Sequence, residues 1–193
     1  MRGDTLLTSL LTVRQIYFSI FQSSSFNPKN GELNMSDMDQ DGKLWIMKEV
    51  YGAKTLPKTE SYETFIKSAL ICAKGDGVLT PEERDWVVGR AAAFRNSGYE
   101  LAKTYPADED LLDVLANSST LNKSGRRMII YVAIQACAAD GEFHPDERAK
   151  VHKMAQSLGI EEDVINEIEQ FCMEEAKMRE KRIALIFPEG VPW

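Results

Sequence analysis

Two short acidic segments carry the side chains best suited to chemistry in this 193-residue sequence. Asp76-Gly77 is followed by Glu83, and Asp140-Gly141 is followed at the same spacing by Glu147. Carboxylates that are held close together either bind a hard cation through oxygen or shift their pKa values upward. Each of these residues also suits a structural role, because Asp accepts hydrogen bonds within a turn and Glu completes a helix capping box. Both interpretations stay open at the level of sequence.

A third acidic segment, Asp37-x-Asp39-x-Asp41-Gly42, matches the opening of an EF-hand calcium loop. Such a loop needs a bidentate Glu at its twelfth position, which is Lys48 here. We therefore expect an Asp-rich turn that caps a helix over residues 44–51, rather than a calcium loop.

The other reactive residue types give little support for catalysis. The sequence has two histidines and contains no GxSxG elbow, no glycine-rich phosphate loop and no HExxH motif. Its three cysteines, Cys72, Cys137 and Cys172, lie in apolar helical contexts without CxxC spacing. This pattern predicts buried, reduced thiols and a reducing compartment. The sequence favours a protein that is not an enzyme.

The composition of the chain argues against one class of partner, the nucleic acids. Thirty acidic residues against 23 Lys and Arg give a net charge of −7, and such a chain repels the phosphate backbone of nucleic acids unless it has a local basic face. We find no such face, so we expect no nucleic-acid partner. The 44% of hydrophobic residues is typical of a globular chain that buries a core.

An internal repeat organises the middle of the chain. A shift of 64 residues aligns residues 65–94 with residues 129–158. In each copy an apolar stripe predicts a core-facing helix, a glycine ends it, and a second helix follows with proline at its first position. Thr80 and His144 occupy the cap positions of these second helices, and Glu83 and Glu147 complete the capping boxes. The repeat therefore predicts two related helical hairpins, at about residues 60–96 and 124–160.

The remaining segments also have helical patterns. Acidic residues 108–110 open a short apolar run, Ser124 can cap a helix over residues 125–138, and a long final helix is predicted over residues 161–186. The apolar tail 183–193 suits packing, and such a tail can also dock on a partner. No stretch shows sustained alternation with period two, so we predict an all-α fold.

Residues 5–22 predict an amphipathic helix, with Arg14 inside its apolar arc. About 17 residues with a central Arg make a poor bilayer span, so we expect no transmembrane helix. The helix suits docking on the body or on a partner. The alternative is an organellar presequence, with Met35 as an alternative start. We divide the chain into an N-terminal helix and linker, residues 1–34, and a helical domain, residues 35–193.

The paired strings ALICAKGDGVLTPEERDWVVGRAAAF and AIQACAADGEFHPDERAKVHKMAQSLGI resemble the TerB-like domain of tellurite resistance proteins, over about residues 60–172. The resemblance implies a duplicated helical bundle, often near membranes or in stress-response systems, with a cation site at its two acidic turns. Carried over by position, the ligands are Asp76, Glu83, Asp140 and Glu147. The expected cation is Ca²⁺ or Mg²⁺, since Cys and His are not clustered.

These observations together predict a non-enzymatic TerB-like module that acts as a cation-responsive scaffold in a stress-response or membrane-associated system. We expect it in the cytoplasm, with a protein partner or a second copy of itself, and in peripheral contact with a membrane. The alternative is a structural accessory subunit of a larger complex, which would be organellar if residues 1–34 are a presequence.

Overall fold

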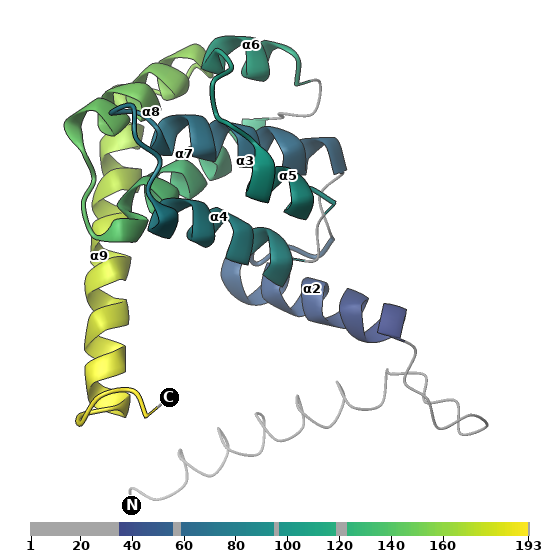
Figure 1. Ribbon diagram of the computed structural model, residues 1–193, viewed down its shortest axis with the longest axis vertical. Coiled ribbons are helices and arrows are strands. Elements are labelled where there is room, and N and C mark those ends of the chain that lie inside the picture. Colours follow the sequence, from purple (N-terminus) through teal and green to yellow (C-terminus); the bar gives the residue numbers. More distant parts are fainter. Residues whose placement is uncertain (1–34, 56–58, 95–96, 119–122, 193) are drawn as a thin grey trace, which may run out of the picture. The chain divides into compact units, whose positions relative to one another are not determined.

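The computed structural model describes residues 35–55, 59–94, 97–118 and 123–192 (Figure 1). Throughout these ranges the regular structure is helical and contains no strand, which confirms the predicted all-α fold. The predicted helix at residues 5–22 lies outside the described residues, so the division of the chain at residue 34 stays a prediction. In chain order the elements are α2 (Met35–Tyr51), α3 (Thr59–Ala73), α4 (Pro81–Ala93), α5 (Tyr99–Thr104), α6 (Leu111–Ala116), α7 (Lys123–Cys137), the 3₁₀ turn η1 (Ala138–Asp140), α8 (Pro145–Ser157) and α9 (Glu162–Ile186).

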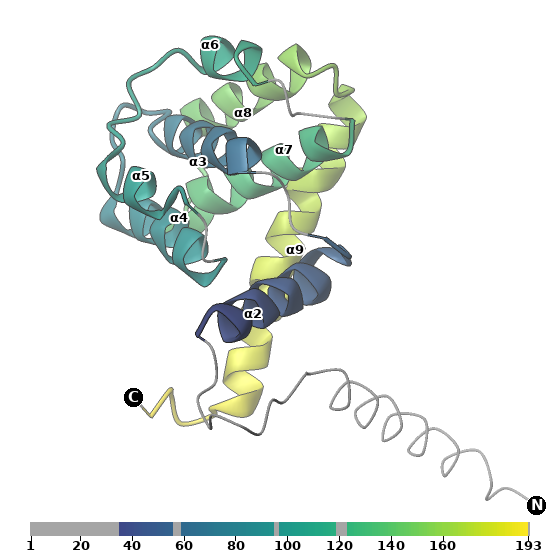
Figure 2. The ribbon, with the colours of Figure 1, turned by 90° about the vertical axis from the view of Figure 1, so that its right-hand side faces the viewer.

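The first helices of the two repeats, α3 and α7, lie side by side at the centre of the fold (Figures 1 and 2). They share the most extensive contact between any two helices in the described ranges. Leu70 and its repeat equivalent Ile134 are both fully buried. Small residues at Ala69 and Ala133 are equally buried and let the two helices approach closely.

Each repeat forms a hairpin, and the two hairpins exchange contacts. Helix α4 packs on α3 of its own repeat and on α7 of the other, while α8 packs on α7 and on α3. The turn η1 at the end of α7 also contacts α4. The predicted duplication is therefore an approximate twofold arrangement, in which the second helix of each repeat packs on the first helices of both repeats.

The other helices complete the bundle. Asp110 caps α6, as the acidic run predicts, with its Oδ1 accepting the N–H of Leu112 at 2.8 Å. Helix α7 begins at Lys123, so Ser124 lies inside the helix instead of capping it. Helix α5 has only six residues and was not predicted. No helix in the described ranges is long and apolar enough to cross a membrane.

Helix α9 covers the predicted final helix and contacts α7 and α8 through its N-terminal half. Ile165 is fully buried there, whereas Leu185 and Ile186 near the other end are 72% and 60% exposed. The expectation that the apolar tail packs within the chain is wrong for these residues, because the final turns of α9 extend beyond the core.

The expectation of an Asp-rich turn before residue 44 is also wrong. Helix α2 begins at Met35, so Asp37, Asp39, Asp41 and Gly42 are all helical. Acidic residues are favourable in the first turn of a helix, beside its unpaired N–H groups. The segment is neither an EF-hand loop nor a cap.

Candidate functional site

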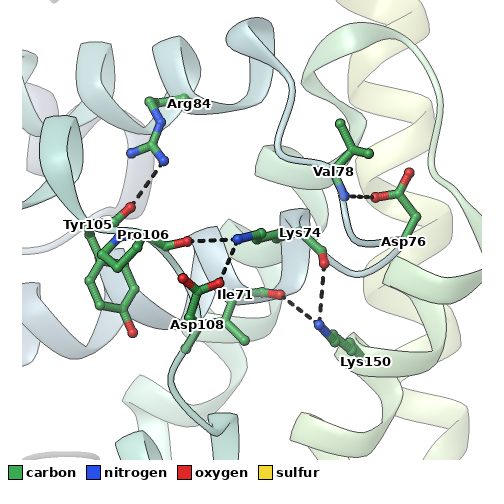
Figure 3. A network of polar contacts seen from close by, with 9 residues as sticks. All are labelled: Ile71, Lys74, Asp76, Val78, Arg84, Tyr105, Pro106, Asp108 and Lys150. Carbon is green, nitrogen blue, oxygen red and sulfur yellow. Dashed lines mark hydrogen bonds and ion pairs between the residues drawn. The ribbon is translucent and has the colours of Figure 1, made fainter.

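The first acidic turn joins α3 to α4 and is closed by its own side chains (Figure 3). Asp76 Oδ1 accepts the N–H of Val78 at 2.8 Å, which is the predicted turn hydrogen bond. Gly77 has φ +100°, a backbone conformation that favours glycine. Together these two residues reverse the chain ahead of α4.

Thr80 and Glu83 form the predicted capping box at the start of α4. The Thr80 N–H donates to Glu83 Oε2 at 2.7 Å, and the Thr80 hydroxyl donates to the same oxygen at 2.9 Å. In return, the Glu83 N–H donates to Thr80 Oγ1 at 3.2 Å. These hydrogen bonds fix the position of the Glu83 carboxyl, and its Oε2 atom accepts two of them.

The second turn repeats this geometry between η1 and α8. Asp140 Oδ1 accepts the N–H of Glu142 at 3.0 Å, and Gly141 has φ +101°, within one degree of Gly77. His144 is the N-cap: its N–H donates to Glu147 Oε2 at 2.9 Å, and its Nδ1 accepts a backbone N–H. Both capping boxes predicted from the repeat are confirmed.

A backbone contact docks the first turn on the second repeat. A Cβ atom placed on Gly75 would lie 2.5 Å from Glu147 Cα and 2.7 Å from Glu147 N. Only glycine fits at this position, because the backbone of the turn lies directly against the start of α8. Gly77 has the positive φ, while Gly75 is required for the close approach.

This docking brings the carboxyl groups of Glu83 and Glu147 together in the interior. The two residues are only 2% and 3% exposed, and their side chains are hydrogen-bonded to each other. Burial raises the pKa of Glu147 well above its ordinary value, and the contact with Glu83 raises it further, while the His144 N–H opposes this. A hydrogen bond between two carboxyl groups needs one proton, and the raised pKa means that the pair holds it.

The four predicted ligands thus divide into a buried pair and an exposed pair. Asp76 and Asp140 are exposed and used in their turns, although the charge of Asp76 is close enough to add to the raised pKa of Glu147. Within the described residues no group of three or more His, Cys, Asp or Glu is arranged to hold a metal ion. Binding of Ca²⁺ or Mg²⁺ by all four carboxylates stays a prediction.

The fold and these paired turns have a counterpart among solved structures. The crystal structure of a tellurite resistance protein from Nostoc punctiforme is similar to this chain, with a TM-score of 0.72 and 40% sequence identity. The similarity covers 81% of this chain and 99% of that protein. The chain belongs to the TerB-like family of tellurite resistance proteins. Comparisons with protein-family models and with curated proteins give no match.

Two cysteines of this TerB-like domain lie beneath the carboxyl pair. Cys72 and Cys137 are fully buried and free, as predicted, and Cys172 is also free and buried, at 7% exposure. Burial raises the pKa of the Cys72 thiol to about 12, with Lys150 opposing the shift and the charge of Glu147 adding to it. Neutral, enclosed thiols are poor nucleophiles, so they act as small core residues.

Two lysines and an arginine that fix the first turn were missed at the level of sequence (Figure 3). Lys150 Nζ of α8 donates to the carbonyls of Ile71 and Lys74 at 3.5 and 3.3 Å, which caps the end of α3 from the other repeat. Lys74 Nζ contacts Asp108 Oδ1 at 2.6 Å, and Arg84 donates to the Tyr105 carbonyl at 3.0 Å. The signal for Lys150 was its departure from the repeat, since the aligned residue is Trp86.

Proposed function

We propose that this TerB-like domain is a non-enzymatic scaffold whose paired acidic turns respond to a divalent cation, as a cytoplasmic component of a stress-response or membrane-associated system. The observation that carries the proposal is the buried contact between Glu83 and Glu147, one carboxyl from each repeat. A bound cation would replace the proton that this pair holds and would link the two hairpins.

Calcium and magnesium need more oxygen ligands than one carboxyl pair supplies. Asp76 is the nearest candidate for a further ligand, because its charge already acts on Glu147. Asp140 occupies the equivalent position in the second turn and is exposed. To bind the cation, the Asp76 and Asp140 carboxylates would give up the backbone N–H hydrogen bonds that they now accept. Cation binding would therefore reorganise the surface of the two turns.

Two observations support a role without catalysis and within a stress response. The buried carboxyls have no open access for a substrate, at 2% and 3% exposure, and the cysteines beneath them are neutral. The similar solved structure is that of a tellurite resistance protein, which supports the stress-response context.

A structural accessory subunit is the second candidate. It is favoured by the exposed apolar end of α9, where Met178, Leu185 and Ile186 are each at least 60% exposed. Exposed apolar side chains that gather at one end of a helix are typical of a surface that a partner covers. On this candidate the acidic turns serve only to cap helices.

Native mass spectrometry of the full chain, before and after chelation, with thermal melting in parallel, separates the two candidates. The proposal predicts a soluble monomer or dimer that carries Ca²⁺ or Mg²⁺, loses it to the chelator, and melts at a lower temperature afterwards. Glu83→Gln should abolish the cation adduct while preserving the capping geometry, and Glu180→Gln on the exposed face of α9 should keep it. A chain that stays insoluble without a partner, or never carries a cation, contradicts the proposal and favours the accessory subunit.

A further inference from the structure

A second site lies in an apolar pocket whose described walls contain none of the acidic turn residues. The pocket is formed by helices α2, α3, α4 and α7 and opens to solvent on one side. Its lining includes Met47, Ile66, Val87, Phe94, Met128 and Val132. Arg90 of α4 is the one charged side chain in the described lining, and Tyr62 adds a hydroxyl group.

The Arg90 guanidinium is held by aromatic rings and not by polar partners. Its Cζ lies 5.3 Å from the ring centroids of Tyr51 and Trp86 and 4.9 Å from that of Phe94. Aromatic rings accept no in-plane hydrogen bonds, so such contacts leave the N–H groups of a guanidinium available for an anion. Within the described chain Arg90 makes no hydrogen bond and no ion pair, so these donors are unused.

The unused donors are partly enclosed. Burial lowers the pKa of Arg90 to about 10, with nearby Tyr131 opposing the shift, so the side chain keeps its charge at neutral pH. A buried charge without a partner is costly, and an anionic group placed against the Arg90 guanidinium would relieve that cost.

We propose that this pocket binds a carboxylate with an apolar body, of the fatty-acid class. The planar carboxylate would accept two N–H bonds from the Arg90 fork, and the chain would lie among the apolar lining. A single arginine matches one negative charge, which favours a carboxylate over a phosphate dianion. The enclosed volume of the pocket is only about 40 Å³, so it holds the carboxylate end of the ligand, and a short or medium-length chain would extend along the apolar lining through the open mouth.

The proposal is independent of the cation site and is tested by titrating the full chain with decanoate, below its micellar concentration, by calorimetry. Binding should also change the fluorescence of Trp86, whose ring lies against Arg90. Decanol is the matched ligand control, since it has the same apolar body without the charge. We expect decanoate to bind at least about tenfold more tightly than decanol, because only the carboxylate satisfies the guanidinium.

Arg90→Gln should weaken decanoate binding by at least about tenfold and leave decanol binding unchanged. Arg179→Gln, on an exposed position of α9, is the matched control and should bind decanoate as the wild type does. If Arg90→Gln fails to fold, Val132→Phe serves instead, because it fills the pocket while leaving Arg90 in place, and it should abolish binding. Absence of decanoate binding to the wild type, equal binding of decanol, or unchanged binding in the folded variants overturns the proposal.

Discussion

At the scale of single residues, Glu147 has two roles that pull in different directions. Its Oε2 accepts the His144 N–H and so caps α8, a role that suits a negative charge. Its burial against Glu83 instead favours the neutral acid. The second effect is larger, because burial is the leading cause of the shift and the charges of Glu83 and Asp76 add to it.

The raised pKa of Glu147 makes stability depend on pH in a defined direction. The pKa rises from 4.5 to about 8 in the folded chain, so between these values the folded state holds a proton that the unfolded state has lost. This contribution to stability is fully present below pH 4.5 and is lost as the pH rises through about 8. Raising the pH across this window should therefore lower the unfolding free energy by up to about 5 kcal/mol, since each pKa unit corresponds to about 1.4 kcal/mol.

Denaturant unfolding of the wild type and Glu147→Gln at several pH values measures this effect. Gln resembles the protonated acid and keeps the capping box, so the variant should lose the decline between pH 5 and pH 8.5 that the wild type shows. Glu180→Gln, exposed on α9, serves as the matched control and should keep the wild-type profile. A wild-type profile in Glu147→Gln would show that Glu147 is ionised in the folded chain.

At the scale of elements, the docking of the first turn on α8 depends on Gly75. Gly75→Ala should lower the unfolding free energy by about 1–3 kcal/mol or more, since its Cβ would press on the Glu147 backbone, which cannot move aside easily. Gly89→Ala is the matched control in α4, where a Cβ meets nothing within 4 Å, and it should stabilise the helix by up to about 1 kcal/mol. Thermal melting checks both variants, and an equal effect of the two would contradict the close approach.

The helices of the two repeats were predictable from the sequence. In each copy an apolar stripe, a glycine that ends the first helix, an N-cap residue and a proline occur at matching positions. Local capping signals placed Thr80 and His144 correctly, and the acidic run 108–110 marked the start of α6, whereas Ser124 was expected as a cap and lies inside α7. Six-residue α5 was missed because it is too short to show a period, and the segment before residue 44 was misassigned because Asp also suits the first turns of a helix.

The candidate site, like the fold, was predictable only in part. The repeat predicted that carboxylates of the two turns would meet, and Glu83 and Glu147 do so. The apolar stripe did not reveal Gly75 as a contact or Lys150 as a cap, because each depends on a residue that is distant in sequence. Of the three rings around Arg90, Trp86 and Phe94 lie four residues away in the chain, whereas Tyr51 is distant in sequence. Such long-range polar contacts leave no periodic signal.

At the scale of the whole molecule, the family assignment and the approximate twofold give the two hairpins equivalent positions around one buried carboxyl pair. A ligand bound by both carboxyls would therefore link the two repeats. If the carboxyl pair is purely structural, it only fixes how the two hairpins pack on each other. The central claim is that a cation replaces the proton of this pair.

Calorimetry with Ca²⁺ and Mg²⁺ in two buffers of different ionisation enthalpy tests that claim most directly. The account predicts binding of one cation with release of about one proton, and strongly non-additive losses of affinity in Asp76→Asn, Asp140→Asn and the double variant, because shared ligands act as a unit. The result that would contradict it is the absence of binding heat at millimolar cation, with each single variant losing only the roughly 1 kcal/mol of stability expected of a turn.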